Sequence, residues 1–298
     1  MKITILGQSG QLARELQKYL KSYELTILNR EQLDLLNINK IAEVLSKYHH
    51  DIIINATGSN KVEEIENNDN EYERANIINN LALGEVAKYC SDNDIYFISY
   101  STDYVFDGKR DTPYLEDSLT NPQTRYGTTK EQGERRILAN MSNCLIMRVS
   151  WVYSNGAPNF LHTILNLLKS NKQIKVVSDQ FGTPTSASFI AFVTQQLIKQ
   201  YESYNNSFSI LGIMNVVPDG DTSWYLYAKL IEEIFRGTDF NVSDSLIKNI
   251  SSDEYSRIFN TSINRPRYSV LCNTKMKKIV FKDTELWSSY LRELLEST

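Results

Sequence analysis

The chain has 298 residues, with 32 lysines and arginines against 36 aspartates and glutamates and a net charge of −4. Such a mild charge argues against a nucleic-acid groove and a polybasic membrane surface, so we expect neither partner. Cys90, Cys144 and Cys272 are far apart and lack a CxxC pair, which argues against a disulfide framework or a zinc site. No secretory signal and no run of about 20 apolar residues is present, and we expect a cytoplasmic protein.

The first half of the chain alternates short apolar runs with longer helical patterns. This rhythm, with Ile-rich runs suited to strands buried on both sides, predicts a doubly wound parallel sheet of the Rossmann type. Strands are expected at residues 3–7, 24–29, 51–57, 95–102 and 143–153. Helices are expected at 11–23, 38–50 and 76–94, and a further helix that carries Tyr126 continues over 130–141. The polar, Asn-rich segment 67–80 is interpreted as a loop entering a helix.

Beyond Tyr153 the alternation loosens. Helices are expected at 159–171, 188–203 and 223–235, a strand at 210–218, and irregular structure at 172–187. We therefore predict a dinucleotide-binding domain at 1–150, extended by about 185–217. A smaller C-terminal lobe, assembled from about 151–184 and 218–298, is expected mainly to bind substrate.

The stretch "GQSGQLA" joins the first expected strand to the first helix. Gly7 can take the tight turn, and Gly10 lets backbone N–H groups approach a pyrophosphate at the helix N-terminus, where the dipole favours negative charge. Ala13 still permits close packing of helix on strand, and Gln11 and Leu12 belong to the same cofactor-binding turn. Glycines also serve such turns for local reasons alone, but the strand before and the helix after favour a dinucleotide site.

The end of the second strand bears on the choice of cofactor. Arg30 stands where an acidic residue would hold a ribose 2′-hydroxyl and where an arginine can accommodate a 2′-phosphate, so NADPH is modestly favoured over NADH. A solvated surface arginine is an equally good interpretation of Arg30. Asp34 and Leu35 are expected to border the adenine, and Ala56 and Thr57, after the third strand, to line the same cleft.

Tyr126 and Lys130 lie four residues apart and therefore share one helical face. A tyrosine ionises near pH 10, so it exchanges protons near neutrality only if a neighbouring charge stabilises the phenolate, which the ammonium of Lys130 could do. Thr102 ends a strand 24 residues earlier, at the edge where open parallel sheets bind ligands. Strand-end hydroxyl, phenol and ammonium together predict catalysis of hydride transfer by Thr102, Tyr126 and Lys130. Tyr126 and Lys130 are also expected to contact the cofactor, the lysine at its ribose hydroxyls.

With these residues in place, the sequence resembles the extended short-chain dehydrogenase/reductases, and among them the dTDP-4-dehydrorhamnose reductase family. The resemblance covers almost the whole chain and rests on motifs met in the family's order: "GQSGQLA", "STDYVFDG", "RYGTTKEQGE", "MRVSWVY", "DQFGTPTSA", "TSWYLYA" and "RPRYSVL". It implies NAD(P)H-dependent reduction of the C4 ketone of a nucleotide-linked 6-deoxy sugar. The expected substrate is dTDP-4-dehydro-L-rhamnose and the product dTDP-L-rhamnose, a precursor in polysaccharide biosynthesis.

The resemblance also implies a substrate site. The sugar would be bordered by the strand-end run and a tryptophan, and the nucleotide by the "DQFGTPT" and "RPRYSVL" segments. An arginine suits that place because its planar fork matches a phosphate. The residues are Asp103, Tyr104, Trp151, Gln180, Thr183, Pro184 and Arg267. Each also has a structural interpretation, as core filler, turn residue or surface charge.

Related activities are less consistent with these residues. Dehydratases of the superfamily carry a second acid after the threonine, where this chain has Tyr104, and carbanion epimerases use cysteine and histidine near the site, whereas His49, His50 and His162 lie outside the motifs. A non-catalytic dinucleotide-binding regulatory subunit, which this branch also resembles, remains an alternative.

The segment "NATGSNKVEEIE" departs from the family pattern. Residues Thr57, Gly58, Asn60 and Lys61 differ, and Glu64 replaces a lysine. A different nucleotide-linked 4-keto sugar is therefore a further alternative. Some family members bind magnesium through glutamates at a dimer interface, but the matching position here is Ser188, so we expect no metal and leave a homodimer as a possibility.

Overall fold

The computed structural model describes residues 1–156, 158–170, 172–203, 211–236, 246–261, 263–280 and 284–296. Asn171 and Ile210, at the ends of two expected elements, lie outside these ranges. Within them, no helix combines the length and the apolar character that crossing a bilayer requires.

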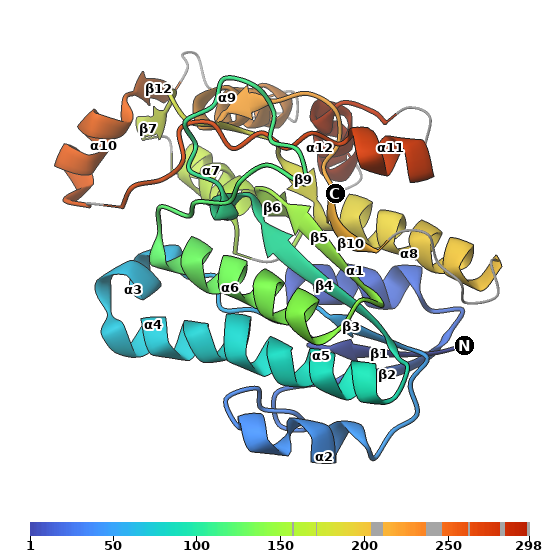
Figure 1. Cartoon of the computed structure of the whole chain (residues 1–298). Coiled ribbons are helices and arrows are strands. Elements are labelled where there is room, and N and C mark those ends of the chain that lie inside the picture. Colours follow the sequence, from blue (N-terminus) through green and yellow to red (C-terminus); the bar gives the residue numbers. More distant parts are fainter. Residues whose placement is uncertain are drawn as a thin grey trace.

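A six-stranded sheet forms the centre of the molecule (Figure 1), and all its pairings are parallel. In spatial order its strands are β10 (Gly212–Asn215), β5 (Cys144–Val149), β4 (Tyr96–Thr102), β3 (Ile52–Asn55), β1 (Lys2–Leu6) and β2 (Glu24–Leu28). The predicted doubly wound fold is therefore confirmed. The strand order reverses beside β1, which pairs with β2 on one side and β3 on the other. Ligands of open parallel sheets bind outside the carboxyl ends of the strands at such a reversal.

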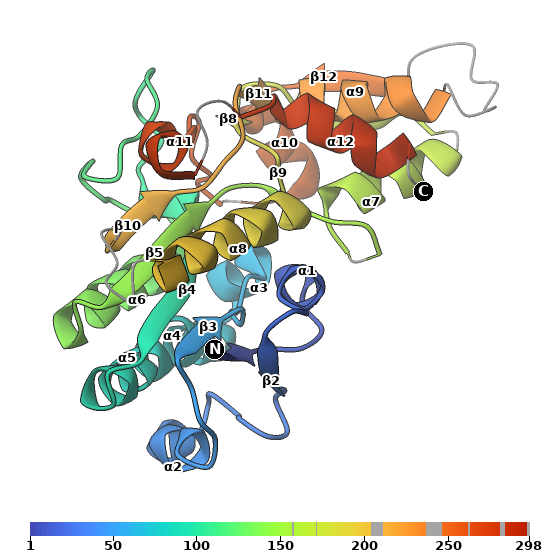
Figure 2. The ribbon, with the colours of Figure 1, turned by 90° about the vertical axis from the view of Figure 1, so that its right-hand side faces the viewer.

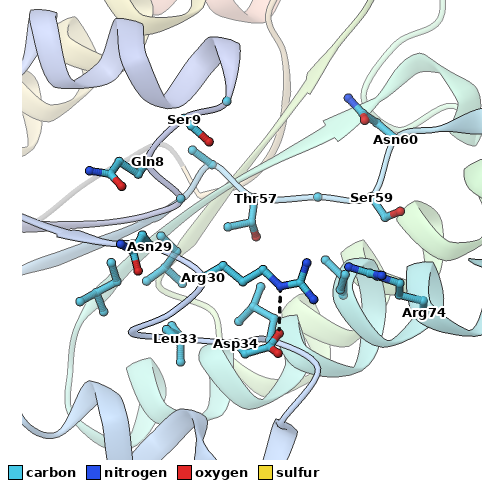
Figure 3. A pocket seen from close by; sticks show the side chains of 18 of the residues that line it. Gln8, Ser9, Asn29, Arg30, Leu33, Asp34, Thr57, Ser59, Asn60 and Arg74 are labelled. Carbon is cyan, nitrogen blue, oxygen red and sulfur yellow. Dashed lines mark ion pairs between the residues drawn. The ribbon is translucent and has the colours of Figure 1, made fainter.

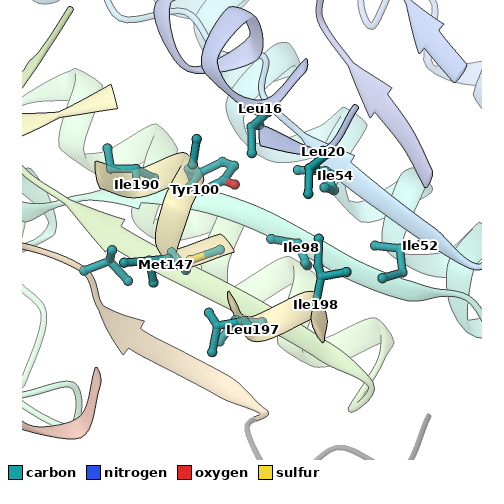
Figure 4. Packing of buried hydrophobic residues seen from close by; sticks show 14 of the residues in the cluster. Leu16, Leu20, Ile52, Ile54, Ile98, Tyr100, Met147, Ile190, Leu197 and Ile198 are labelled. Carbon is teal, nitrogen blue, oxygen red and sulfur yellow. The ribbon is translucent and has the colours of Figure 1, made fainter. Parts of the chain in front are cut away.

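Helices cover both faces of the sheet (Figure 2). On one face lie α1 (Gln11–Tyr19), α8 (Ala187–Ser203) and α11 (Thr274–Val280), and on the other lie α2 (Ile41–Leu45), α5 (Ala82–Asp92) and α6 (Arg125–Asn140). The isoleucines of β3 show why continuous apolar runs form these strands. Ile52 and Ile54 pack toward α1 and α8 (Figure 4), while Ile53 between them packs on the opposite face.

The interpretation of residues 67–80 as a loop is wrong. The structure has α3 (Val62–Asn67), α4 (Asp69–Asn76) and a π-helical turn η2 (Ile77–Leu81), which leads directly into α5. The side chain of Asn68 accepts hydrogen bonds from the amides of Asn70 and Glu71 and so starts α4. Only one residue of α4, Ala75, is buried, and this explains the polar composition that suggested a loop.

The C-terminal lobe lies beyond the carboxyl ends of the strands (Figures 1 and 2). Its helices are α7 (Phe160–Lys169), α9 (Trp224–Arg236), α10 (Ser252–Phe259) and α12 (Trp287–Glu296). Of these helices, α7, α9 and α12 share a third hydrophobic core, which includes Leu161, Tyr227 and Leu291 and also Ile247.

The expectation of irregular structure at 172–187 is also wrong. The segment contains β7 (Ile174–Val177), β8 (Phe181–Gly182) and β9 (Thr185–Ser186), which pair with β12 (Ile247–Ile250), β11 (Thr222–Ser223) and β6 (Val152–Tyr153), respectively. Most of these strands have two residues, too few for a period-two pattern to reveal. Short 3₁₀ turns, η1 (Ile38–Lys40) and η3 (Asp103–Val105), complete the described elements.

Candidate active site

The turn between β1 and α1 has the geometry of a dinucleotide-binding loop. Gly7 has a φ of 103°, and a Cβ at this position would lie 3.2 Å from the carbonyl oxygen of Ala56 and from Cγ2 of Thr57. Gly10 caps α1 without a side-chain hydrogen bond, and the first turn of α1 contains no acidic residue. The first backbone N–H groups of α1 are therefore available to an anion, and the turn fits a pyrophosphate.

A pocket of about 680 Å³ opens beside this turn (Figure 3). It lies at the carboxyl ends of β1, β2 and β3, where the strand order reverses. Its lining includes the predicted cofactor residues Gly7, Gly10, Arg30, Asp34, Leu35, Ala56 and Thr57.

Four predicted cofactor residues lie outside this lining: Tyr126 and Lys130 of α6, and Gln11 and Leu12 of α1. The side-chain oxygen of Gln11 accepts hydrogen bonds from Ser154 (2.9 Å) and Asn159 (2.8 Å), and Leu12 packs against the core under α1. The backbone amides of Gln11 and Leu12, in the first turn of α1, are therefore the groups that could contact a bound pyrophosphate.

Buried asparagines fix the loop that follows β3. The Asn55 side chain accepts a hydrogen bond from the Thr57 amide at 3.1 Å. Asn79, in η2, accepts one from the Ser59 amide and donates to the Ser59 carbonyl, each at 2.8 Å, and it also donates to Thr129 of α6 at 3.0 Å. This π-helical turn therefore ties the loop to α6, a role that the sequence reasoning missed.

The N-terminus of α6, which carries Tyr126, is held by two side chains. The Thr124 hydroxyl accepts a hydrogen bond from the Gly127 amide at 3.0 Å. The carboxylate of Glu66, from α3, accepts one from the Arg125 amide at 2.5 Å and a longer one from the Tyr126 amide at 3.4 Å. The orientation of Tyr126 thus depends on a residue 60 positions earlier.

Thr102, Tyr126 and Lys130 all lie at or near the last residues of β4. Tyr126 is partly exposed, whereas Thr102 and Lys130 are buried. A hydrogen bond with Thr102 acts on the Tyr126 hydroxyl, and the Lys130 ammonium donates to the backbone carbonyl of Tyr100 at 2.6 Å. Thr102 therefore lies beside Tyr126, Lys130 follows one helical turn later with its ammonium on β4, and the catalytic roles of the three stay predictions.

The pKa of Tyr126 is raised overall in this structure, and the predicted stabilisation of its phenolate by Lys130 stays a prediction. Burial raises the pKa of Tyr126, Asp103 and Tyr104 raise it further, and Thr102 opposes them. Burial lowers the pKa of Lys130 from 10.5 to about 8, while the carboxylate of Glu134, one helical turn away, opposes this shift. Glu134 in turn forms a buried ion pair with Arg148 at 2.6 Å, another pair that sequence reasoning missed.

Asp103 is a buried acid directly beside Thr102. It accepts hydrogen bonds from the Thr102 hydroxyl at 3.0 Å and from the Ser269 hydroxyl at 2.5 Å. Burial raises the pKa of Asp103 to about 6, although these hydrogen bonds favour the charged form. Asp103 thereby links the end of β4 to the C-terminal lobe.

Tyr104 lies beside Tyr126. Its ring meets that of Tyr126 edge to face, with centroids 5.7 Å apart. Its hydroxyl accepts a hydrogen bond from Arg265 at 3.3 Å, and Arg265 also forms an ion pair with Glu63 at 2.9 Å. Arg267, which the sequence indicated, is exposed. Both arginines belong to "RPRYSVL", so the motif was identified but the arginine that meets Tyr104 was not.

The remaining predicted substrate residues lie in the C-terminal lobe or at its border. Trp151, with a φ of 45°, stacks on Trp224 with ring centroids 3.5 Å apart. The buried Gln180 donates to Ser252 at 2.9 Å, and the buried Thr183 donates to the carbonyl of Gly220 at 3.0 Å. Pro184 follows, also buried. Trp151, Gln180 and Thr183 thus each have a structural partner, and the roles of all four residues toward a substrate stay predictions.

The family model for the RmlD substrate binding domain matches residues 1–298. The chain belongs to this family. The dTDP-4-dehydrorhamnose reductase of Shigella flexneri is 32% identical over 283 residues, covering 93% of the chain and 91% of that relative. The spore coat polysaccharide biosynthesis protein SpsK of Bacillus subtilis is 30% identical and covers 99% of the chain and 97% of its own length. The family resemblance is confirmed.

Solved structures agree with the assignment to the RmlD family. The dTDP-4-dehydrorhamnose reductase of Bacillus anthracis, in complex with NADP, superposes with a TM-score of 0.87 at 28% identity, covering 100% of the chain and 99% of that structure. The dTDP-4-dehydrorhamnose reductase of Clostridium acetobutylicum gives the same TM-score at 31% identity, also covering 100% of the chain and 99% of that structure.

Two departures from the RmlD family pattern have structural counterparts. Lys61 and Glu64, at the pocket rim, form an ion pair at 2.9 Å. Ser188, at the position expected for a metal-binding glutamate, shares a hydrogen bond with the Tyr19 hydroxyl at 2.8 Å.

Proposed function

We propose that the protein is an NAD(P)H-dependent reductase of a nucleoside-diphosphate-linked 6-deoxy-4-keto sugar, with dTDP-4-dehydro-L-rhamnose as substrate and dTDP-L-rhamnose as product. The observation that carries this proposal is the placement of Tyr126 beside Thr102 at the carboxyl end of β4, with Lys130 one helical turn further along α6, in a chain that matches dTDP-4-dehydrorhamnose reductases over nearly its whole length. The product's place is in polysaccharide biosynthesis.

Tyr126 supplies the proton. A nicotinamide dinucleotide in its reduced form, when bound, supplies the hydride that converts the C4 ketone to an alkoxide. The raised pKa of Tyr126 keeps its phenol protonated at neutral pH, so the proton is in place to neutralise that oxygen. A low pKa would favour the reverse reaction, in which the tyrosine acts as a base.

Thr102 and Lys130 prepare the site for this transfer. The Thr102 hydroxyl lies at the strand end, within hydrogen-bonding reach of Tyr126 and Asp103, and orients the carbonyl oxygen. The Lys130 ammonium, anchored on the Tyr100 carbonyl, stabilises the phenolate left after transfer and binds the cofactor ribose. The cofactor is held by the β1–α1 turn and the pocket beside it, with Gly7, Gly10 and Thr57 in its lining.

The nucleotide sugar lies between the sheet and the C-terminal lobe. We assign its sugar to Asp103, Tyr104 and Trp151, and its nucleotide to Gln180, Thr183, Pro184 and Arg267, and we add Arg265 because its guanidinium meets Tyr104. In this division, residues 1–150 with about 185–217 bind the dinucleotide, and about 151–184 with 218–298 mainly bind the substrate. Both substrates are cytoplasmic metabolites, so we place the reaction in the cytoplasm; a homodimer is an additional expectation.

A different nucleotide-linked 4-keto sugar is the second candidate substrate. The observation that favours it is the ion pair between Lys61 and Glu64 in the segment that departs from the family pattern. This segment begins at the cofactor pocket and leads into α3, whose Glu63 pairs with Arg265. A change of charge in this segment can therefore alter the electrostatic environment of the proposed sugar-binding residues.

Tyr126→Phe tests the proposed reaction. We expect wild-type protein to oxidise NADPH with dTDP-4-dehydro-L-rhamnose, followed by loss of nicotinamide absorbance, and the variant to lose roughly 10²–10⁴-fold in kcat, the usual contribution of a general acid. Its dissociation constant for NADPH should change less than about twofold, because the phenol is not a main cofactor contact. Other 4-keto sugar nucleotides run in parallel distinguish the second candidate. Tight NADPH binding without turnover of any of them would overturn the reductase assignment and support a regulatory subunit.

A further inference from the structure

Two arginines enter the cofactor pocket from opposite walls. Arg30 follows β2, and Arg74 lies on α4, a helix that the sequence had suggested to be a loop. Figure 3 shows both side chains extending into the pocket, with the guanidinium of Arg30 directed toward the side where Arg74 lies. Like charges that face one another across a pocket repel unless an anion lies between them.

Neither arginine forms a short ion pair with a carboxylate among the described residues. Arg30 has only a long contact with Asp34, 3.8 Å from Nε to Oδ1, and the two side chains are 65% and 45% exposed. Arg74 makes no ion pair or side-chain hydrogen bond within the described ranges, and it is only partly exposed. Lys61, the other cation of the lining, is paired with Glu64. Exposed ion pairs contribute little, so an anion can replace Asp34 at Arg30 easily.

The place of the arginines in the pocket identifies the anion. The pyrophosphate is accounted for by the β1–α1 turn, and the end of the second strand is where a Rossmann-type fold holds the adenosine ribose. An anion beside Arg30 is therefore attached to that ribose. The group that distinguishes NADPH from NADH is the 2′-phosphate at this position.

We propose that Arg30 and Arg74 form a two-arginine clamp for the 2′-phosphate of NADPH, and that Arg74 is the second residue determining cofactor preference. The inference rests on the proposed function only for the identity of the ligand as a nicotinamide dinucleotide. Two planar guanidinium groups approaching from opposite walls supply several donors to one phosphate, which a single solvated arginine cannot do. NADPH is then preferred over NADH.

A binding titration without any sugar nucleotide tests the clamp. Full-length wild-type protein, Arg30→Gln and Arg74→Gln are titrated with NADPH and separately with NADH, following nicotinamide fluorescence. Arg292→Gln is the matched control, because Arg292 is an ion-paired surface arginine on α12, outside the pocket. Circular dichroism and thermal melting verify that each variant is folded.

We expect wild-type protein to bind NADPH at least about tenfold more tightly than NADH, and each pocket variant to raise the NADPH dissociation constant about tenfold, since a charge-assisted contact is lost. The NADH dissociation constant should stay within about twofold, and Arg292→Gln should change neither. Equal binding of both cofactors by wild-type protein would overturn the proposal. So would an Arg74→Gln variant that binds NADPH normally or weakens NADPH and NADH alike. Because no sugar is present, failure of the proposed reaction does not affect this result.

Discussion

Lys130 is a residue of the candidate site whose charge changes in the mildly alkaline range. Its side chain is buried, and desolvation lowers the pKa of the ammonium to about 8. The pKa of Tyr126 is raised, so the phenol stays protonated well above that pH. In the alkaline range the first of the two groups to lose its proton is therefore the lysine, and its positive charge disappears before the phenol ionises.

This order predicts an alkaline limit to activity. Below about pH 8 Lys130 is charged and stabilises the phenolate that forms on proton transfer, and above it this charge is lost. We expect kcat/KM for the 4-keto sugar nucleotide to fall about tenfold per pH unit above pH 8. Lys130→Arg, whose guanidinium stays charged, should be less active but should lack this fall. A wild-type profile that is flat to pH 10 contradicts the assignment.

At the scale of elements, α6 is positioned by a carboxylate from another helix. Glu66 of α3 accepts the hydrogen bonds of the Arg125 and Tyr126 amides, at the helix end where a negative charge is stabilising. We expect Glu66→Ala to destabilise the fold by about 1–3 kcal/mol, the range for charge-assisted hydrogen bonds. It should also lower kcat more than it raises KM, because Tyr126 lies in the first turn of α6. Glu73→Ala, an exposed acid on α4, is the control. Equal stability and kinetics of the two variants would count against this role.

The contact between α6 and η2 has no room for a side chain. A Cβ on Gly133 would lie 2.1 Å from the backbone oxygen of Asn79, whereas at Gly84 of α5 it would meet the flexible side chain of Arg136. Alanine usually stabilises a helix by about 1 kcal/mol over glycine. Here we expect Gly133→Ala to destabilise by about 1–3 kcal/mol through overpacking and Gly84→Ala to cost less. Urea denaturation measures both, and the opposite order would show that α6 and η2 separate easily.

Local sequence patterns predicted the strands and helices whose apolar residues recur with a regular period. The Ile-rich strands of the sheet and helices such as α8 follow directly from their apolar periodicity. The helix α4 could not be found in this way, because it buries a single residue, Ala75, and its start depends on a side-chain cap. The pairing of β7 with β12 joins segments about 70 residues apart, a distance that no local pattern specifies. For the same reason the sequence did not predict the hydrogen bonds of Glu66 with the first amides of α6 or those of Asn79 with Ser59, although the segments that contain these residues were identified.

At the scale of the whole molecule, one cation joins the two sides of the proposed substrate cleft. Arg265 follows α10 of the C-terminal lobe, yet it pairs with Glu63 of α3 and donates to Tyr104, which meets Tyr126. Its guanidinium is largely screened from solvent, so an anionic substrate gains more from it than from the exposed Arg267.

We therefore expect Arg265→Gln to raise KM for the nucleotide sugar at least about tenfold, the effect of losing one charge-assisted contact to a phosphate. NADPH binding should be unchanged, because Arg265 lies outside the cofactor pocket. Arg267→Gln is the matched control from the same motif and should raise KM less, since its side chain is exposed. Steady-state kinetics with saturating NADPH give both values. A larger effect at Arg267 would favour the original sequence prediction, and an equal loss of NADPH affinity in Arg265→Gln would mean that the arginine holds the two lobes together rather than binding the substrate.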